Sequence, residues 1–196
     1  MNATPGPPLA AKVALRDQVR ASRRRRPLAE AAEDAAAIAA HLLAAPDVRR
    51  AATVAAYVGV GPEPGTGLLL DALTDAGKRV ILPVVMPDLD LDWAAYTGSA
   101  GLAPAGRGLL EPASERLGLD AIATADVVLL PGLAVSSTGM RLGRGGGCYD
   151  WVLARVPVGT FTCVVLYDDE VGREVPTEPH DRRVAAAVSP AGIVTF

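Results

Sequence analysis

The N-terminal part of the chain alternates apolar and polar positions with the period of an α-helix. From about Leu9 to Arg26 the pattern predicts a first helix. Four cations recur at every fourth residue and share one face of it, which we call the basic stripe: Lys12, Arg16, Arg20 and Arg24. Such a stripe is either a solvated surface or a binding face. The Pro-rich residues 1–8 precede this helix, and we expect them to form a flexible lead.

A second helix is predicted from apolar residues at helical spacing, ending near Pro46: Leu28, Ala31, Ala35, Ile38, Ala39 and Leu42. The run "TVAAYVGVG" then predicts a strand, and "RVILPVV" predicts another. Between them lies a helical pattern with Thr66 as its cap and Gly77 at its end, which completes a βαβ unit. Later runs predict further strands in "LDWAAY", "DVVLLPGLAV", "TFTCVVLY" and "VAAAVS", and a short helix in "WVLARV".

These elements predict an α/β fold with three layers, in which helices cover both faces of a mostly parallel central sheet. The chain has 196 residues, of which 50% are hydrophobic. That is long enough for one substantial core and short for a second domain. We find no internal repeat and no low-complexity linker, so we expect residues 9–196 to form a single domain.

The net charge and the cysteine content of the chain limit which ligands and partners we expect. The formal net charge is -3, so no global positive field attracts nucleic acid or an anionic membrane. An anionic ligand must instead be bound by local arginine clusters, which occur at residues 23–26, 141–144 and 182–183. The two cysteines, Cys148 and Cys163, form no metal or disulfide pattern and favour a reducing compartment, the cytoplasm. No apolar run approaches the length of a membrane span.

The stretch "GMRLGRGGGCYD" is the strongest candidate for chemistry. Glycine buries little surface and loses much backbone freedom on folding, so a run of glycines is poorly suited to packing. It does let main-chain amides face phosphate oxygens, beside Arg141 and Arg144 and the start of a helix near Tyr149. Asp150 would repel a phosphate unless a cation such as Mg²⁺ lies between them. A flexible hairpin is the alternative, and no Lys-Ser/Thr pair follows to make a Walker A loop.

Two further loops carry acidic side chains. "GVGPEPG" is not a dinucleotide fingerprint, because Pro64 stands where a third glycine belongs. Its Glu63 either accepts hydrogen bonds from the amino groups of a heterocycle or faces water in a turn. "PTEPHDRR" offers Glu178 and Asp181 as a second carboxylate for a metal. His180 with Asp181 would be an acid/base pair, which we weight lower because adjacent loop residues usually point apart.

In this order the motifs resemble the 5-formyltetrahydrofolate cyclo-ligases, also called 5,10-methenyltetrahydrofolate synthetases. The matching segments span nearly the whole chain: "KVALR", "YVGVGPEPGT", "VILPVV", "GLLEP", "LLPGLAVSSTGMRLGRGGGCYD" and "PTEPHD". The resemblance implies an ATP- and Mg²⁺-dependent cyclisation of 5-formyltetrahydrofolate to 5,10-methenyltetrahydrofolate, in which the formyl oxygen is phosphorylated and ADP and phosphate are released. It also implies a Rossmann-like architecture similar to that of sugar-phosphate isomerases and CoA transferases, and we expect a monomer.

The same resemblance implies roles for individual residues. Catalysis would fall to Arg141 and Arg144, and Mg²⁺ binding to Asp150 and Asp181. The implied ATP-binding residues are Lys12, Arg16, Arg141, Leu142, Gly143, Arg144, Gly145, Gly146, Gly147, Cys148 and Tyr149. The implied folate-binding residues are Val58, Glu63, Arg144, Gly145, Gly146, Gly147 and Cys148.

Three positions depart from the family pattern. Cys148 replaces an aromatic residue, Gly146 replaces a lysine that some members carry, and Glu170 lies near the position of a usual glutamine. Three other residues receive no role: Trp93, Tyr96 and Glu111. Of these, Trp93 and Tyr96 either pack in the core or line a pterin pocket.

Other functions remain as alternatives. A non-catalytic folate- or nucleotide-binding protein of the same fold would keep Glu63 but could lose Asp150 or Asp181. A sugar-phosphate isomerase or CoA transferase would share the architecture. Those reactions need a poised base or a nucleophilic glutamate more than a pair of carboxylates beside a glycine loop. A nucleic-acid-binding module conflicts with the negative net charge and the scarcity of stacking aromatic residues.

Overall fold

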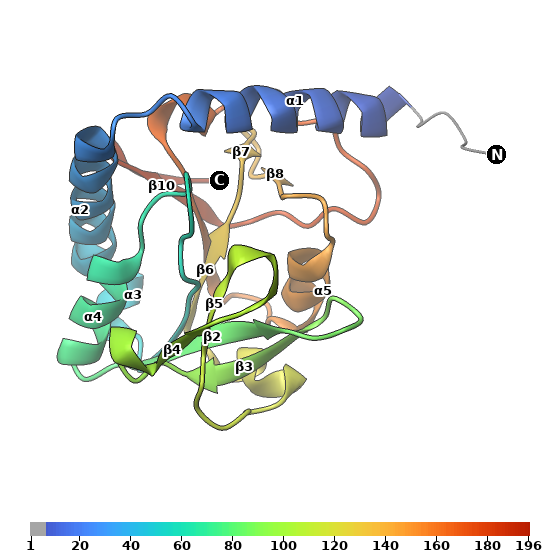
Figure 1. The fold of residues 1–196 in the computed structure, drawn as a ribbon. Helices are drawn as coiled ribbons and strands as arrows, with labels where there is room; N and C mark the ends of the chain where they lie inside the picture. Colours follow the sequence, from blue (N-terminus) through green and yellow to red (C-terminus); the bar gives the residue numbers. More distant parts are fainter. Residues whose placement is uncertain (1–6) are drawn as a thin grey trace.

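A seven-stranded sheet lies at the centre of the computed structural model, which describes residues 7–196 (Figure 1). In spatial order its strands are β11 (Gly192–Thr195), β10 (Ala186–Ser189), β9 (Phe161–Val165), β6 (Val127–Pro131), β1 (Thr53–Ala55), β2 (Arg79–Val85) and β3 (Leu91–Ala95). The five inner strands run parallel, and each edge strand is antiparallel to its neighbour. This confirms the predicted mostly parallel sheet, with antiparallel pairing only where a short hairpin joins neighbours.

Two small antiparallel pairs lie outside this sheet. They are β4 (Leu102–Pro104) with β5 (Leu110–Pro112), and β7 (Ala134–Val135) with β8 (Arg141–Leu142). The run predicted as one strand, "DVVLLPGLAV", is therefore two strands, β6 and β7. The break follows Pro131, and the chain leaves the central sheet there to pair with the start of the glycine-rich segment.

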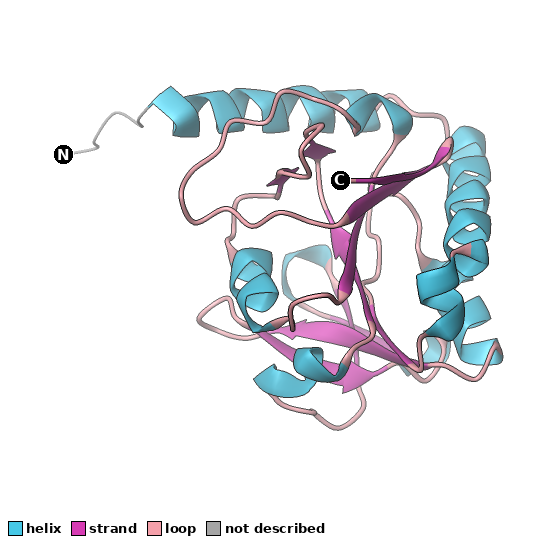
Figure 2. Ribbon diagram, turned by 180° about the vertical axis from the view of Figure 1, so that it is seen from behind, coloured by secondary structure: helices cyan, strands magenta, loops and turns pink. Residues whose placement is uncertain are grey.

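Helices cover both faces of the sheet, as predicted (Figures 1 and 2). The α-helices are α1 (Pro7–Arg23), α2 (Leu28–Ala44), α3 (Pro46–Arg50), α4 (Gly67–Asp75) and α5 (Cys148–Arg155). Short 3₁₀ turns are η1 (Ser99–Gly101), η2 (Gly106–Gly108), η3 (Leu119–Thr124) and η4 (Asp168–Glu170). One buried cluster joins α2, α3 and α4 to one sheet face, and a second joins α5 and η3 to the other. Apolar burial on both faces explains why the inner strands are almost continuously hydrophobic.

The first helix differs from its predicted boundaries at both ends. It begins at Pro7, so residues 7 and 8 of the predicted flexible lead are helical, whereas residues 1–6 lie outside the described part of the chain. Proline is favoured in a first helical turn, because no intrahelical acceptor is available there for its missing N–H. The helix ends at Arg23 rather than Arg26, and residues 24–26 form turns before Pro27, which itself disfavours helical backbone at Arg26.

Helix α1 lies across the end of the sheet near β7 and β8 (Figure 1). Its apolar residues Leu15 and Val19 pack against Leu133, Ala134 and Leu142. The basic stripe runs along the helix beside this apolar face. The packing therefore places the stripe beside the loops that leave the carboxyl ends of the parallel strands, where open α/β sheets bind ligands.

Thr66 occupies the N-cap position of α4 as predicted, but its side chain makes no capping hydrogen bond. Its hydroxyl donates to the carbonyl of Tyr57 at 2.7 Å and accepts the N–H of Gly59 at 2.9 Å. The residue thus fixes the loop after β1, which carries Glu63. Gly77 adopts φ 75° just beyond the helix, as the sequence predicts for its end.

An ion pair ties the last turn of α5 to the β2–β3 hairpin, since Arg155 Nη1 donates to Asp90 Oδ1 at 2.7 Å. These hydrogen bonds hold the pKa of Asp90 below its usual value. A depressed carboxyl pKa contributes stability above the unfolded value, about 3.9, and loses it as the pH falls through the folded pKa.

We therefore expect Asp90→Asn to lower the free energy of unfolding at pH 7, and expect its difference from wild type to shrink as the pH falls below about 4. Urea unfolding at pH 7, 5 and 3 measures this, with the exposed Asp75→Asn as a control. A difference that is equally large at pH 3 would contradict the ionic contribution of the pair.

Candidate active site

A cavity of about 620 Å³ opens where the loops after β1, β2 and β6 meet α1, the glycine-rich segment and the segment before β10. This volume is typical of small-molecule sites. Every residue assigned a role from the sequence lines it: Lys12, Arg16, Val58, Glu63, Arg141, Leu142, Gly143, Arg144, Gly145, Gly146, Gly147, Cys148, Tyr149, Asp150 and Asp181. The fold thus brings together segments from both ends of the chain.

Three members of the basic stripe face this cavity. Lys12 is buried, and its Nζ donates to Glu178 at 2.7 Å and to both carboxylate oxygens of Asp181 at 2.7 and 2.9 Å. Burial alone would lower the pKa of Lys12, but these hydrogen bonds outweigh it and raise the pKa. The ammonium is therefore charged at neutral pH, and for Lys12 the solvated-surface interpretation of the stripe is wrong.

The next two members of the stripe hold the glycine-rich segment. Arg16 Nε donates to the carbonyl of Gly143 at 2.9 Å, and Arg20 Nη2 donates to that of Arg144 at 3.1 Å. Burial, and then the neighbouring charge of Arg20, lower the pKa of Arg16. Arg24, by contrast, is exposed and does not line the cavity. Three residues of the stripe therefore line the cavity, and its last residue is solvated.

Glycine is required at particular positions of this segment. Gly145 and Gly147 adopt φ 103° and 74°, in the left-handed region that favours glycine. A Cβ on Gly143 would lie 2.7 Å from Arg141 Nη1. Gly147 is also the N-cap residue of α5, with no side chain to cap the first amides of that helix. Those amides, at the positive end of the helix dipole, border the cavity and suit an anionic ligand.

Arg141 is a buried cation in the cavity wall. Its Nη2 donates to Asp150 Oδ1 at 3.1 Å and its Nη1 to the carbonyl of Pro131 at 3.3 Å. Its Nε is buried with no partner among residues 7–196. A buried donor without a partner is costly, so the guanidinium is not fully satisfied by the protein's own groups.

Arg144 and Glu63 join the two glycine-bearing loops across the cavity. Arg144 Nη1 donates to Glu63 Oε1 at 3.0 Å, and Glu63 Oε2 accepts the N–H of Val60 at 3.1 Å. The side chain of Glu63 is 9% exposed, so it is not a turn residue facing water. Arg144 is 52% exposed, and its ion pair with Glu63 therefore contributes little to stability.

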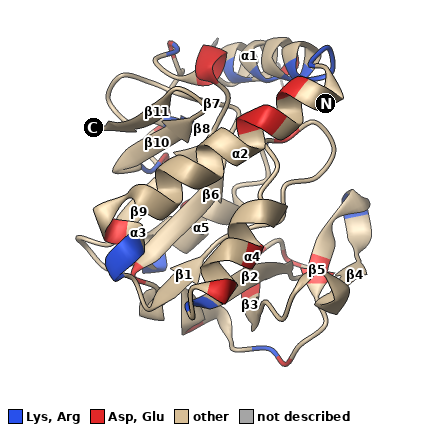
Figure 3. Ribbon diagram, turned by 90° about the vertical axis from the view of Figure 1, so that its left-hand side faces the viewer, with Lys and Arg blue, Asp and Glu red and all other residues tan. Residues whose placement is uncertain are grey.

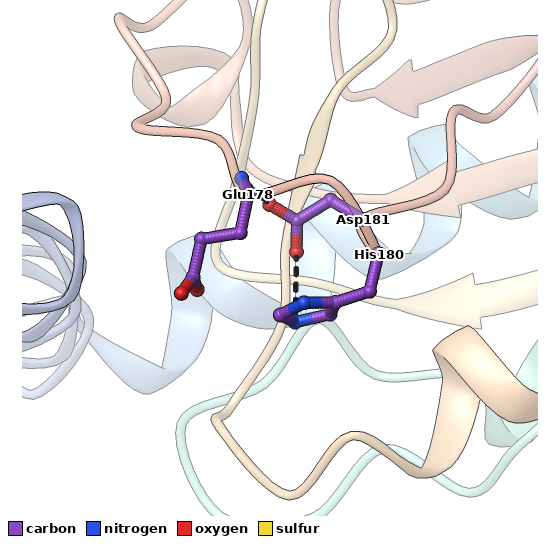
Figure 4. Close-up of side chains that lie close together, drawn as sticks. All are labelled: Glu178, His180 and Asp181. Atoms are coloured by element: carbon purple, nitrogen blue, oxygen red, sulfur yellow. Dashed lines mark hydrogen bonds and ion pairs between the residues drawn. The ribbon is translucent and has the colours of Figure 1, made fainter.

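The two predicted metal ligands line the same cavity, but each is paired with a different cation: Asp150 with Arg141, and Asp181 with Lys12. Around Asp181 the structure places Glu178 and His180, with one ligand atom from each of the three within 4.8 Å of the others (Figure 4). Two of the three are carboxylates, the ligand type that Mg²⁺ prefers.

His180 and Asp181 do not point apart, contrary to our argument from adjacent loop residues. His180 Nε2 lies 3.8 Å from Asp181 Oδ1 (Figure 4). This distance exceeds that of a hydrogen bond, and the side chain of His180 is 68% exposed. The chain turns sharply here because Asp181 Oδ2 accepts the N–H of Glu178 at 2.7 Å, which folds the segment back on itself.

Sequence reasoning missed most of the remaining cavity wall, although it had offered Glu178 as a carboxylate for a metal and His180 as part of an acid/base pair. The cavity's other lining residues are Leu9, Arg20, Tyr57, Pro83, Val85, Leu91, Arg107, Leu109, Leu110, Glu111, Pro131, Glu178 and His180. Many are apolar and suit a flat organic ring system. Tyr57 is buried with its hydroxyl unpartnered among the described residues, and burial raises its pKa, so it is neutral. The available signal was a position at or just beyond the carboxyl end of a parallel strand: Tyr57 follows β1, and Pro131 ends β6.

Trp93 and Tyr96 do not line the cavity. They are buried in the two core clusters on opposite faces of the sheet. Successive side chains of a strand alternate between its faces, so two residues three positions apart face opposite sides. The hydroxyl of Tyr96 donates to Asp71 at 2.6 Å. Both residues are therefore structural. Glu111 lines the cavity, and its Oε1 accepts the N–H of Val85 at 2.9 Å, which ties β5 to the end of β2.

The departures from the family pattern fall in different places. Cys148 begins α5 and lines the cavity, and burial raises the pKa of its thiol, as expected for a packing residue more than a nucleophile. Gly146 is exposed on the cavity wall. Glu170 lies outside the cavity lining and forms a buried ion pair with Arg23, Nε to Oε1, at 2.7 Å.

Comparisons with known proteins agree with one another. The family model described as the 5-formyltetrahydrofolate cyclo-ligase family matches residues 8–190. The 5-formyltetrahydrofolate cyclo-ligase of Mycolicibacterium smegmatis is 43% identical over 150 residues, covering 74% of this chain and 77% of the relative. That of Escherichia coli K12 is 30% identical over 163 residues, covering 79% and 87%.

Two solved structures share the fold. The NMR structure of Aquifex aeolicus 5,10-methenyltetrahydrofolate synthetase has a TM-score of 0.81 at 25% identity and covers 94% of this chain and 92% of its own. The Mycoplasma pneumoniae 5,10-methenyltetrahydrofolate synthetase has a TM-score of 0.73 at 19% identity, covering 91% and 98%, and supports the fold alone. Within residues 7–196, no helix has the length and apolar character needed to cross a membrane.

Proposed function

Because this chain belongs to the 5-formyltetrahydrofolate cyclo-ligase family, we propose that it closes 5-formyltetrahydrofolate to 5,10-methenyltetrahydrofolate with ATP and Mg²⁺. The formyl oxygen attacks the γ-phosphorus of ATP, and the bond from that phosphorus to ADP breaks. N10 then adds to the activated formyl carbon and loses its proton. The carbon–oxygen bond breaks last, and phosphate leaves.

One observation carries this proposal. The cavity is lined by cations and carboxylates from α1, the glycine-rich segment and the segment before β10, and its remaining wall is largely apolar. Phosphoryl transfer depends mostly on positioning and on neutralising charge. We assign Lys12, Arg16 and the segment from Arg141 to Tyr149 to the phosphates of ATP. The unpartnered Nε of the buried Arg141 supports this, because a phosphate oxygen would complete its hydrogen bonding.

The donor set fits a magnesium ion. Glu178, His180 and Asp181 lie close enough together to share an ion, and Asp150 lines the same cavity. We assign Asp150 and Asp181 to the magnesium, with Glu178 beside Asp181 as a further carboxylate. When bound, Mg²⁺ supplies neutralisation of the phosphate charge during transfer. Lys12 and Arg141 already neutralise these carboxylates in part, so the cavity wall tolerates two acids close to an anionic ligand.

We assign Val58, Glu63 and the apolar wall to the folate. Glu63 Oε1 and Oε2 face groups that donate hydrogen bonds, and the amino-pterin edge offers such donors. Arg144 borders both substrates and would position the formyl oxygen against the phosphate. We also propose a single domain over residues 9–196 that acts as a monomer. Two free thiols support a cytoplasmic location.

The test is to mix the purified protein with 5-formyltetrahydrofolate, Mg²⁺ and ATP, and to follow the absorbance of the methenyl product. We expect product with all components, and none without ATP. Equilibrium binding of both substrates without turnover would instead support the non-catalytic alternative.

Glu63→Gln is expected to raise the KM for 5-formyltetrahydrofolate about 10-fold or more, while the KM for ATP changes little. A buried carboxylate that accepts charge-matched hydrogen bonds contributes about 1.5–3 kcal/mol, and the amide replaces one acceptor oxygen by a donor. Steady-state kinetics with each substrate varied in turn measure the split. An unchanged folate KM would show that Glu63 lies away from the pterin edge.

A further inference from the structure

Arg107 differs from every other cation of the cavity wall. Lys12, Arg16, Arg20, Arg141 and Arg144 each donate a hydrogen bond to a carboxylate or carbonyl oxygen of the protein. Arg107 also lines the cavity, but within residues 7–196 its guanidinium has no hydrogen bond or ion pair. The protein therefore supplies partners for all of its cavity cations except this one.

The backbone of Arg107 is also unusual. The residue lies in η2, at the tip of the hairpin between β4 and β5, with φ 63° and ψ 22°. A left-handed backbone disfavours a residue with a side chain, and glycine stands on both sides of Arg107. A third glycine would satisfy this turn with less strain, so the turn itself does not explain the arginine.

The hairpin holds this side chain at the rim. The hairpin of β4 and β5 projects from the main body of the molecule beside β2 and β3 (Figure 3). Glu111 anchors it by accepting the N–H of Val85. Leu109 and Leu110, which follow Arg107 and Gly108 in the chain, belong to the apolar wall of the cavity. The charge of Arg107 also acts on Cys148: burial raises the pKa of that thiol, and Arg107 partly opposes the rise. The tip therefore faces the start of α5 across the cavity.

Arg107 lies on the β4–β5 hairpin, apart from the segments that we assign to ATP. The cations that we assign to the phosphates lie on α1 and in the glycine-rich segment, where hydrogen bonds to protein oxygens hold them in place. A folate joins an apolar ring system to a glutamate tail, which carries two carboxylates in its monoglutamate form and more in longer forms. An exposed guanidinium at the edge of an apolar wall matches a carboxylate that stays partly in water.

We propose that Arg107 binds the carboxylates of the folate's glutamate tail and so favours substrates with longer, more negatively charged tails. This assignment rests on the proposed function. It adds a specificity-determining residue at the rim, on a hairpin that takes no part in the assigned ATP contacts.

The experiment compares three substrates with wild-type protein and Arg107→Gln: 5-formyltetrahydropteroate, which lacks glutamate, and the mono- and triglutamate of 5-formyltetrahydrofolate. Glutamine keeps most of the length and the polar character and removes the charge. We expect KM for the monoglutamate to rise about 5-fold, which corresponds to about 1 kcal/mol for an exposed ion pair. The rise should be larger for the triglutamate and absent for the pteroate, with kcat unchanged throughout.

Matched variants complete the design. Arg107→Lys should keep part of the tail preference, because it keeps the charge without the forked donors. Arg116→Ala removes an exposed arginine outside the cavity and should change no KM. Glu111→Ala releases the hairpin anchor and displaces the apolar wall together with Arg107, so it should raise KM for the pteroate as well, whereas Arg107→Gln should not.

Two results would overturn the assignment. An equal rise in KM for the pteroate, which ends in its benzoate carboxylate, would place Arg107 at the ring end of the ligand instead of along the glutamate tail. Unchanged KM values for all three substrates would make it a surface residue. Failure of the wild-type protein to convert any of the three would instead refute the proposed function, and is seen before any variant is compared. Added salt should reduce the wild-type preference for the triglutamate, because exposed ion pairs are screened.

Discussion

Replacing Asp181 with Asn is expected to lower kcat by about 10²- to 10³-fold, the usual cost of removing one preorganised charge at a reacting centre. Its carboxylate binds Lys12 through both oxygens and accepts the N–H of Glu178. Asparagine keeps the shape and one acceptor but removes the charge that the proposed metal requires. Lys12 keeps its contact with Glu178, so we expect the fold to persist.

The measurement is the initial rate of methenyl formation across a Mg²⁺ titration, with circular dichroism to check folding. Asp150→Asn should cause a similar loss through the other side of the proposed metal site, and it also leaves Arg141 without its carboxylate. Asp120→Asn, an exposed acid outside the cavity, is the matched control. A wild-type rate in either cavity variant would refute its assignment as a metal ligand.

Glu170→Gln is expected to lower the free energy of unfolding by about 3–5 kcal/mol, because it breaks a buried ion pair and leaves one charge uncompensated. Arg23 donates from Nε and Nη2 to the two oxygens of Glu170 at 2.7 Å, and Nη2 also donates to the carbonyl of Gly132. Burial raises the pKa of Glu170, while the hydrogen bonds from Arg23 favour its ionised form. The pair fixes the end of α1 to η4, and the hydrogen bond to Gly132 ties it to the turn after β6.

Urea unfolding measures this loss, and Asp169→Asn, on the exposed neighbouring residue, is the control. Replacing both partners with apolar residues, Arg23→Met with Glu170→Met, should cost less than either single change, because no buried charge is left alone. A double variant as unstable as the sum of the single ones would contradict this account. We also expect the single variants that remain folded to bind ATP more weakly, since Lys12 and Arg16 depend on the position of α1.

Short-range patterns predicted the elements well. Helical spacing located α2, and β-rich runs located six of the seven strands of the central sheet, whereas the edge strand β11 was not predicted. The errors fell where the chain turns. Pro7 and Pro8 were taken for a loose lead, although proline is well suited to a first helical turn. The run through Pro131 was taken for one strand, because the sequence does not show which side of the central sheet the chain leaves.

The candidate site was predicted through its motifs, and its apolar wall was not. Glycines beside arginines indicate an anion site from local chemistry alone, and the acids near them indicate a cation. Leu109 and Leu110 resemble any other surface or core residues until the hairpin is placed. Glu170 was considered only as a variant of a site residue, and tertiary packing made it a structural one.

The sequence by itself determined the α/β class, the glycine-rich segment and the residue types that suit a phosphate, because these depend on periodicity and on chemistry within a few neighbouring residues. Tertiary structure alone decided that Lys12 contacts Asp181, 169 positions away, and that Arg144 contacts Glu63. It also left Arg107 at the cavity rim without a hydrogen-bond partner among residues 7–196. Charges interact through distance in space, and that distance is set by the packing of α1 and the hairpins on the sheet, which no separation along the chain encodes.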